Sequence, residues 1–372
     1  MMVVARVLFA LFLYLYFALA QGDSLAYVCS MVAGRPVELC SWLFALVLLV
    51  VWMGVCRLVE WVGRRCGFHS FTAYLFCAWG AAALVSVPVG SWAWQVGLLL
   101  SALALALLHG LWLRHGRRTG VRSIWEKYLV DGFRLLVLFL YMGLGAACSD
   151  VDHYEMRTAA CLRAHMPERA YEVGKNQLAT SPRLFALRCM AMASDSTGLG
   201  GRIFSQPCFA GLSSVSLFPP NDERESLLFP VDSLFAMLGD SIRFAEEPLA
   251  YFRRCAELSG AGKSVAADYY LCGLLLERRL DEFARELKCF YADELVAHRS
   301  LPLYYAQAMV MYARLRTRPL WVYSASEVEA NYHDFRHMAE GIPDEVARCN
   351  LLRRSYGETY WWFFEYGQTL SD

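Results

Sequence analysis

The chain has 372 residues, a formal net charge of +0, 57% hydrophobic residues and 19% charged residues. A soluble domain has about half apolar and about a quarter charged residues, so the surplus apolar content predicts a membrane segment. Residues 1–149 hold 5 acidic against 11 basic side chains, whereas residues 150–372 hold 30 against 24. The resulting net charge of −6 in the second part gives no electrostatic reason to expect a nucleic-acid partner.

Five apolar stretches predict a transmembrane domain over residues 1–150, with about five helices. A membrane-spanning helix needs about 20 mostly apolar residues, with a range of about 17–25. The first, third and fourth stretches reach this length. The second is short unless residues 37–41 extend it, and the fifth carries Asp131 and Arg134 near its start. The five stretches are Val3–Ala20, Trp42–Cys56, Phe71–Val89, Trp92–Leu113 and Leu129–Cys148.

Basic residues in the short loops predict the orientation of these spans. Eight of them follow the second and fourth stretches, whereas the loop between the first and second contains only Arg35. Because cytoplasmic loops carry the excess of Lys and Arg, we expect a cytoplasmic N-terminus and residues 151–372 on the other side. This topology is that of a multi-pass inner-membrane protein with a periplasmic domain. The eight residues are Arg57, Arg64, Arg65, Arg114, Arg117, Arg118, Arg122 and Lys127.

The apolar stretches leave two alternatives open. Residues 18–20, Ala-Leu-Ala, resemble a signal-peptidase site, but we favour an uncleaved first span because further spans follow. Polar side chains inside a bilayer usually mark a transport pathway, and here His109 and Gln95 lie near the ends of the fourth stretch. Their scarcity favours anchoring in the lipid bilayer over transport.

Residues 151–372 show helical periodicity, so the predicted fold class is all-α: N-terminal transmembrane helices followed by a soluble α-helical-repeat domain. A first helix pair over residues 154–178 is broken at Pro167 and ended by Pro182. A Gly-, Ser- and Pro-rich segment at about 195–232 predicts an irregular insertion. Helix pairs of about 30 residues indicate tetratricopeptide-like units, which commonly present a concave surface to a peptide or protein. The later predicted helices are 266–278, 283–291, 303–316, 328–340 and 344–356.

Three runs of this region resemble a known family. They are residues 269–276 (YYLCGLLL), 301–308 (LPLYYAQA) and 356–362 (YGETYWW), with support from TGLG at 197–200 and IFS at 203–205. Together they resemble an uncharacterised Bacteroidetes family of multi-span inner-membrane proteins with a C-terminal tetratricopeptide-like helical region. The resemblance implies an architecture and a compartment. Because that family has no assigned activity, it implies no catalytic residue and no cofactor.

Two histidines form the strongest candidate for a metal site. His333 and His337 are four residues apart on one helix face, as zinc ligands are, and Asp334 lies beside the first. A third ligand is not evident, and Asp is shorter than the Glu that serves as general base in metalloproteases. We therefore favour a polar, solvated helix face and predict no bound metal.

Other chemical motifs are weaker. Residues 260–264, Gly-Ala-Gly-Lys-Ser, end like a phosphate-binding loop, but the position of its first glycine is Glu257, so we predict a turn between helices. Six carboxylates could supply a pair for glycoside chemistry, although a solvated acidic surface is the more common outcome. They are Asp195, Asp222, Glu223, Glu225, Glu246 and Glu247.

The 13 cysteines show no CxxC spacing, so a metal or redox motif is not supported. Their placement on apolar faces predicts buried, small hydrophobic side chains. Cys29 and Cys40 share the first outer loop, which leaves a disulfide between them open. The aromatic run at residues 361–364 is interpreted as a cap on the last repeat or as a contact with the bilayer interface.

These observations predict a membrane-anchored helical-repeat protein. We expect the exported domain to act as an interaction or scaffold module that docks a protein or peptide partner in its concave face. One alternative is an enzyme or accessory subunit of envelope glycan or lipid processing, and a second is a transporter component. No catalytic residue is assigned.

Overall fold

The computed structural model describes residues 3–33, 41–66, 69–88, 90–116, 124–195, 198–209, 211–220, 231–243, 246–260, 262–296 and 300–367. Helices and turns make up these ranges and no strand occurs in them, so the predicted all-α class is confirmed. The chain divides into two compact units, Met1–Met156 and Arg157–Asp372. The division falls six residues beyond the boundary expected from composition.

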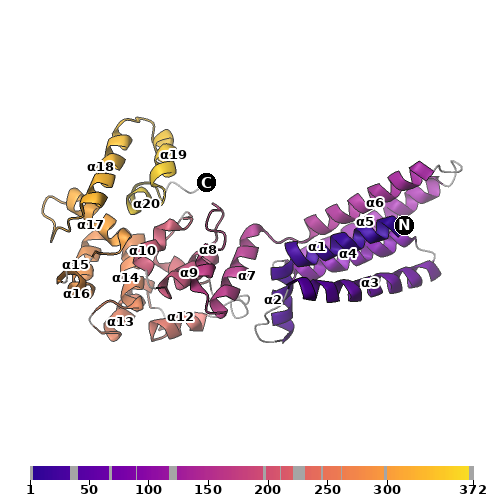
Figure 1. The fold of residues 1–372 in the computed structure, drawn as a ribbon, viewed down its shortest axis with the longest axis horizontal. Coiled ribbons are helices and arrows are strands. Elements are labelled where there is room, and N and C mark those ends of the chain that lie inside the picture. The colour runs from indigo at the N-terminus through magenta and orange to yellow at the C-terminus, as the bar shows by residue number, and fades with distance from the viewer. Residues whose placement is uncertain are drawn as a thin grey trace. The chain divides into compact units, whose positions relative to one another are not determined.

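The first unit is a helical bundle (Figure 1). Four stretches in its described residues are long and apolar enough to cross a membrane: Val3–Ala20, Trp42–Arg65, Trp92–Arg114 and Trp125–Gly145. Its helices are α1 (Val3–Leu15), the π-helix η1 (Tyr16–Ala20), α2 (Gly22–Ala33), α3 (Ser41–Arg65), α4 (Ser70–Ser86), α5 (Trp92–Gly116) and α6 (Ile124–Gly145).

Two spans differ in length from those predicted, and the fifth could have been interrupted by its charges. The second span is longer, because α3 continues past Cys56 to Arg65, where Glu60 pairs with Arg64 at 2.7 Å. The fifth is a continuous helix in spite of its two charges. The third is shorter, because Pro88 follows α4 closely and has no N–H to continue the helical hydrogen bonds. At 17 residues, α4 is about 25 Å long.

Contacts at the two ends of the bundle show that its long helices alternate in direction. At one end Arg134 of α6 lies over Phe71 of α4, with 5.9 Å between the guanidinium carbon and the ring centre. Arg134 also bonds His109 of α5 at 3.1 Å. At the other end a Cβ on Gly145 of α6 would lie 2.9 Å from Ala82 of α4 and 3.2 Å from Leu98 of α5. Hence α4 runs parallel to α6, and α5 runs antiparallel to both.

The first helix belongs to the same alternating arrangement. Arg6 bonds Glu60 at 2.9 Å, and the Phe17 and Trp52 rings meet at 6.1 Å, so α1 runs antiparallel to α3. Phe9 and Phe17 are fully buried in the core of the bundle. Removal of this segment by a signal peptidase would expose that core, so the packing favours the uncleaved interpretation.

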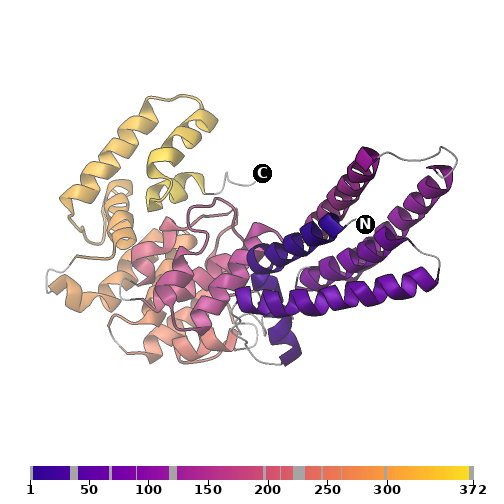
Figure 2. The same cartoon turned by 45° about the vertical axis from the view of Figure 1, so that its right-hand side comes forward.

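The second unit contains the helices predicted from periodicity and several others (Figures 1 and 2). The predicted helices correspond to α14 (Val265–Leu276), α15 (Leu280–Phe290), α17 (Leu303–Leu315), α18 (Ser326–Glu340) and α19 (Glu345–Tyr356). The first predicted pair, over residues 154–178, corresponds to α7 (Asp150–Arg163), which crosses the boundary, and α8 (Pro167–Glu172), which ends earlier than expected. The others are α9 (Pro182–Ala193), α10 (Leu199–Arg202), η2 (Ile203–Ser205), η3 (Ser214–Leu217), α12 (Val231–Leu238), α13 (Pro248–Leu258), α16 (Ala292–Val296) and α20 (Tyr360–Tyr366).

Pro182 begins a helix, whereas the sequence analysis took it as the end of one. Proline is well suited to the first turn, where its missing N–H would have no partner in any case. Ser181 caps this end of α9, since its Oγ accepts a hydrogen bond from the Leu184 N–H at 3.0 Å. The expected irregular insertion contains the short helices α10, η2 and η3, and its residues 221–230 lie outside the described ranges.

Two central helices, α14 and α17, are covered on all sides. Every residue from Ala266 to Leu276 is buried, and so is every residue from Tyr304 to Tyr312. Neighbouring helices of the stack cover part of this surface, while α10 contacts both helices and α20 contacts α17. Other segments of the second unit therefore cover α14 and α17, and neither helix presents an exposed face between Ala266 and Leu276 or between Tyr304 and Tyr312.

The cover over α14 and α17 depends on two glycines. A side chain at Gly200 would overlap the ring of the fully buried Tyr305. Gly198 has a φ of +72°, which glycine adopts readily, and a Cβ there would lie 2.8 Å from the Asp268 carboxylate. The polypeptide thus lies directly on the side chains of α14 and α17.

Candidate functional site

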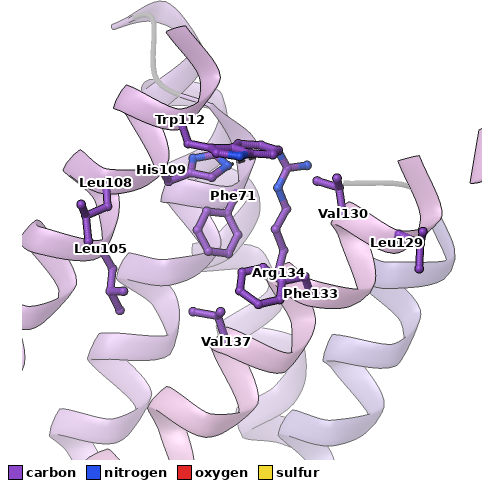
Figure 3. A pocket seen from close by; sticks show the side chains of 10 residues that line it. All are labelled: Phe71, Leu105, Leu108, His109, Trp112, Leu129, Val130, Phe133, Arg134 and Val137. Carbon is purple, nitrogen blue, oxygen red and sulfur yellow. Dashed lines mark hydrogen bonds between the residues drawn. The ribbon is translucent and has the colours of Figure 1, made fainter. Parts of the chain in front are cut away.

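A pocket of about 490 Å³ opens between α5 and α6 of the first unit (Figure 3). Its walls are mostly apolar, and several of the lining side chains project outward from helices that are candidate membrane spans. Leu108, Leu129 and Phe133 are 62%, 74% and 67% exposed, so in a membrane they would face acyl chains. The pocket is lined by Phe71, Leu105, Leu108, His109, Trp112, Leu129, Val130, Phe133, Arg134 and Val137.

A buried polar cluster forms one wall of this pocket. Arg134 is 9% exposed and its Nη1 donates to Asp131 Oδ1 at 2.8 Å, while its Nη2 lies 3.1 Å from His109 Nε2. A guanidinium can only donate, so His109 Nε2 is the acceptor and the imidazole proton is on Nδ1. Figure 3 shows the Arg134 side chain extending from α6 toward Trp112, with His109 below that ring.

Two N–H donors of this cluster have no acceptor. Arg134 Nε and His109 Nδ1 are both buried, and neither has a hydrogen-bond partner in the part of the chain that the structure describes. A buried donor without a partner costs about 1–3 kcal/mol. The cluster therefore favours a pocket occupant that brings an acceptor, above all a negatively charged oxygen.

The second unit has a polar cleft of about 340 Å³. Lys175 and Arg353 stand on its walls, both are exposed, and no ion pair in the described ranges joins either to a carboxylate. The cleft is lined by Lys175, Asn176, Gln177, Leu178, Ser205, Gln206, Pro207, Cys208, Arg353, Gly357, Glu358 and Trp362.

An amide and a thiol in the lining of this cleft limit its chemistry. Gln206 is 4% exposed, its Nε2 donates to Cys189 Sγ at 3.4 Å, and its Oε1 has no partner among the described residues. Burial raises the pKa of the Cys208 thiol to about 12. Because the thiol stays protonated at neutral pH, Cys208 is not an activated nucleophile, and the cleft is better suited to binding than to covalent catalysis.

The histidine pair lies on α18, with the rings 6.5 Å apart. The side chain of His333 is 81% exposed, and His337 is exposed as well. The described residues contain no group of three or more His, Cys, Asp or Glu placed to hold a metal ion. The motif that ends like a phosphate-binding loop lies within residues 259–264, which connect α13 to α14 as predicted from the sequence. Ser264 caps α14, since its Oγ accepts a hydrogen bond from the Ala267 N–H at 3.1 Å.

The candidate carboxylates that the structure describes are not brought together as a catalytic pair. Asp195 lies 3.0 Å from Arg202, and Glu246 lies 2.8 Å from Arg254. The hydrogen bond from Arg254 lowers the pKa of Glu246 to about 2, so this carboxyl group carries no proton to donate at neutral pH. Glu247 is exposed at the start of α13, and Asp222, Glu223 and Glu225 lie outside the described residues.

The sequence predicts burial for the cysteines, and a cap on the last repeat or a bilayer contact for the aromatic run at residues 361–364. Cys189, Cys255 and Cys272 are buried as predicted, whereas Cys289 is exposed. No disulfide joins the cysteines of the described ranges, and Cys40, the proposed partner of Cys29, lies outside them. In the run at 361–364, Trp361, Trp362 and Phe363 are at most 2% exposed and belong to α20, which packs on α17.

Sequence reasoning identified Asp131, Arg134 and His109 as unusual, but not their association. It missed the pairing of Arg6 with Glu60 and the whole polar cleft. The sequence signal that could have indicated these ion pairs is a charged residue inside an apolar stretch, because a buried charge needs a partner.

Comparisons with known proteins assign no activity to either pocket. No curated protein and no solved structure matches the chain. Residues 219–367, most of the second unit, match the model of a family whose description is "Family of unknown function (DUF6057)".

Proposed function

We propose that the protein is anchored in the inner membrane by five helices, with a cytoplasmic N-terminus and a periplasmic second unit. The alternating directions of α1, α3, α4, α5 and α6 support an odd number of crossings. The basic residues lie in the last turns of α3 and in the sequence from Arg114 to Lys127, which joins α5 to α6, at the end of the bundle that also carries Arg6 and Arg134. An excess of positive charge at this end favours its cytoplasmic location.

The proposed topology can be tested with reporter fusions to the full-length chain. Alkaline phosphatase fused after Asp372 is expected to be active, because it folds only outside the cytoplasm, and green fluorescent protein at the same position is expected to stay dark. Fusions at the N-terminus should give the opposite result. A fluorescent C-terminal fusion would contradict the crossing number that we propose.

We further propose that the second unit is an interaction module that binds an acidic segment of a protein partner in the polar cleft. The observation that supports this is that one cleft contains two cations, Lys175 and Arg353, and the buried amide oxygen of Gln206, which has no donor within the described ranges. An extended peptide supplies both complements, since its carboxylates pair with the cations and a backbone N–H reaches the amide. This replaces the concave face as the docking surface, because α14 and α17 are covered.

The alternative of an enzyme in envelope glycan or lipid processing has less support. Acid–base hydrolysis of a glycoside needs two carboxyl groups facing one substrate, one of them able to donate a proton. Among the candidates in the described ranges, Asp195 and Glu246 are each held by an arginine.

Reversing both cleft cations should weaken partner binding. We expect Lys175→Glu/Arg353→Glu to reduce the affinity of the full-length protein for a labelled Glu-rich peptide by about tenfold or more, because two attractions become repulsions. The measurement is fluorescence anisotropy with detergent-solubilised protein, followed by crosslinking of the native partner in membranes.

Arg169→Glu/Arg354→Glu provides the matched control. It makes the same change in net charge at two exposed arginines, one of them adjacent to Arg353, and neither residue lines the cleft. Equal losses in the two double variants would show that only the overall charge matters, and the cleft would then not be the binding site.

A further inference from the structure

We infer that the pocket between α5 and α6 binds an anionic phospholipid, with its phosphate at Arg134 and His109 and its acyl chains along the apolar wall. This inference rests on the membrane location of the first unit and is independent of the peptide cleft. The pocket combines an apolar groove with a buried cation at one wall, so it suits a molecule with a charged head and an apolar tail.

The polar wall specifies the head group. Arg134 and Asp131 already neutralise each other, but the pair leaves the Nε–H of Arg134 and the Nδ1–H of His109 without acceptors. Both nitrogen atoms are buried, so a phosphate reaches them by displacing the side chains that cover them. Its oxygens can then accept from both donors, and a hydrogen bond between charged groups is stronger than a neutral one. Arg114 and Lys127, exposed near the adjoining ends of α5 and α6, add positive charge at the same end of the bundle.

The apolar wall specifies the remainder of the ligand. Leu108, Phe133 and Val137 continue the groove from Arg134 along the direction of the spans (Figure 3). A transmembrane helix of a partner could also cover these side chains. Its backbone groups are already hydrogen-bonded, however, so an apolar partner helix would leave the two donors of the cluster unpaired.

The position along the bundle selects an anionic lipid. The pocket lies at the end with the basic loops, which the arginine distribution places in the cytoplasmic leaflet. Anionic lipids contribute the negative surface potential of that leaflet, and basic pockets between spanning helices on that side bind their head groups. A zwitterionic lipid could fill the groove, but its head group would bring a second positive charge next to Arg134.

The test is native mass spectrometry of the full-length protein titrated with phosphatidylglycerol or phosphatidylcholine of identical acyl chains. The wild-type protein is expected to retain one phosphatidylglycerol with at least about tenfold preference, because both lipids offer the same phosphate acceptor and only phosphatidylcholine adds a positive charge beside Arg134. Asp131→Asn/Arg134→Gln removes both partners of the ion pair and leaves no uncompensated buried charge. It should lose this preference.

Arg6→Gln/Glu60→Gln is the matched control, because it removes the other buried ion pair at the same end of the bundle and does not line the pocket. It should bind like the wild type. If Asp131→Asn/Arg134→Gln does not fold, Leu108→Trp fills the groove from an exposed position without changing any charge and should also lose the lipid. Equal retention of the two lipids by the wild type, or retention of phosphatidylglycerol by a folded pocket variant, would overturn the inference.

Discussion

Asp268→Leu is expected to destabilise the second unit by about 2–6 kcal/mol, because two buried phenol hydroxyls lose their shared acceptor and each unsatisfied donor costs about 1–3 kcal/mol. Asp268 is 5% exposed in the first turn of α14. Its Oδ1 accepts hydrogen bonds from Tyr291 at 2.5 Å and from Tyr305 at 3.1 Å. Both tyrosines are buried, so leucine would leave two phenol hydroxyls without this acceptor.

The loss of stability should appear as faster hydrogen–deuterium exchange in peptides covering Val265–Leu276, because α14 opens more often. The exchange is measured on the full-length protein. Asp268→Asn keeps one acceptor oxygen and should fall between the leucine variant and the wild type. Asp281→Leu is the surface control, because Asp281 is 56% exposed in its pair with Arg316 and such pairs contribute about 0–1 kcal/mol. Equal protection in Asp268→Leu and Asp281→Leu would show that the buried network contributes little.

The helices of the second unit could be predicted wherever one apolar stripe repeats along the sequence. α15 shows this best, with Leu280, Phe283, Leu287 and Phe290 buried on one side. α9 and α13 were harder to recognise, because each begins with proline and is preceded by a turn. In the first unit, apolar content located the five spans but not α2, which lies in a segment expected to be a loop. It also did not set the ends of α3 and α4, which depend on ion pairs and on Pro88.

The two pockets could not be predicted from the sequence, because each is formed by residues far apart along the chain. The polar cleft combines residues 175–178, 205–208 and 353–362. The cover over α14 and α17 likewise depends on Gly200 meeting Tyr305. Local periodicity predicts which face of a helix is buried, but not which distant segment buries it. A concave docking surface follows from repeat architecture and stays a prediction, whereas the contacts of α10 with α14 and α17 could not be read from periodicity.

Alkaline pH is expected to destabilise the second unit strongly. Tyr269, Tyr304, Tyr305 and Tyr360 are nearly or fully buried, and burial is the main cause that raises their pKa values above the usual 10. Asp268 raises the pKa of Tyr305 further. Burial likewise raises the pKa values of the Cys189 and Cys272 thiols. The folded chain therefore holds these protons more tightly than the unfolded chain does.

The sign follows from proton linkage. The stabilisation is complete below the pKa values of the unfolded chain, about 8.5 for Cys and about 10 for Tyr, and is lost as the pH rises toward the folded values. Each group removes about 1.4 kcal/mol per pH unit above its unfolded pKa, so four tyrosines together remove about 5 kcal/mol per unit. The free energy of unfolding should thus be nearly constant from pH 7 to about 8.5 and fall steeply above about 10.

Urea unfolding of the full-length protein from pH 7 to 11.5, followed by proteolysis within the second unit, measures this profile. Tyr360→Phe isolates one group, because the Tyr360 hydroxyl donates only a 3.3 Å bond to the Leu275 carbonyl among the described contacts. Phenylalanine cannot ionise, so the slope above pH 10 should be shallower by about 1.4 kcal/mol per pH unit. If both proteins gave the same slope, the pKa of Tyr360 would not be raised in the folded chain. That result would contradict the prediction, which rests on the complete burial of Tyr360 on α20.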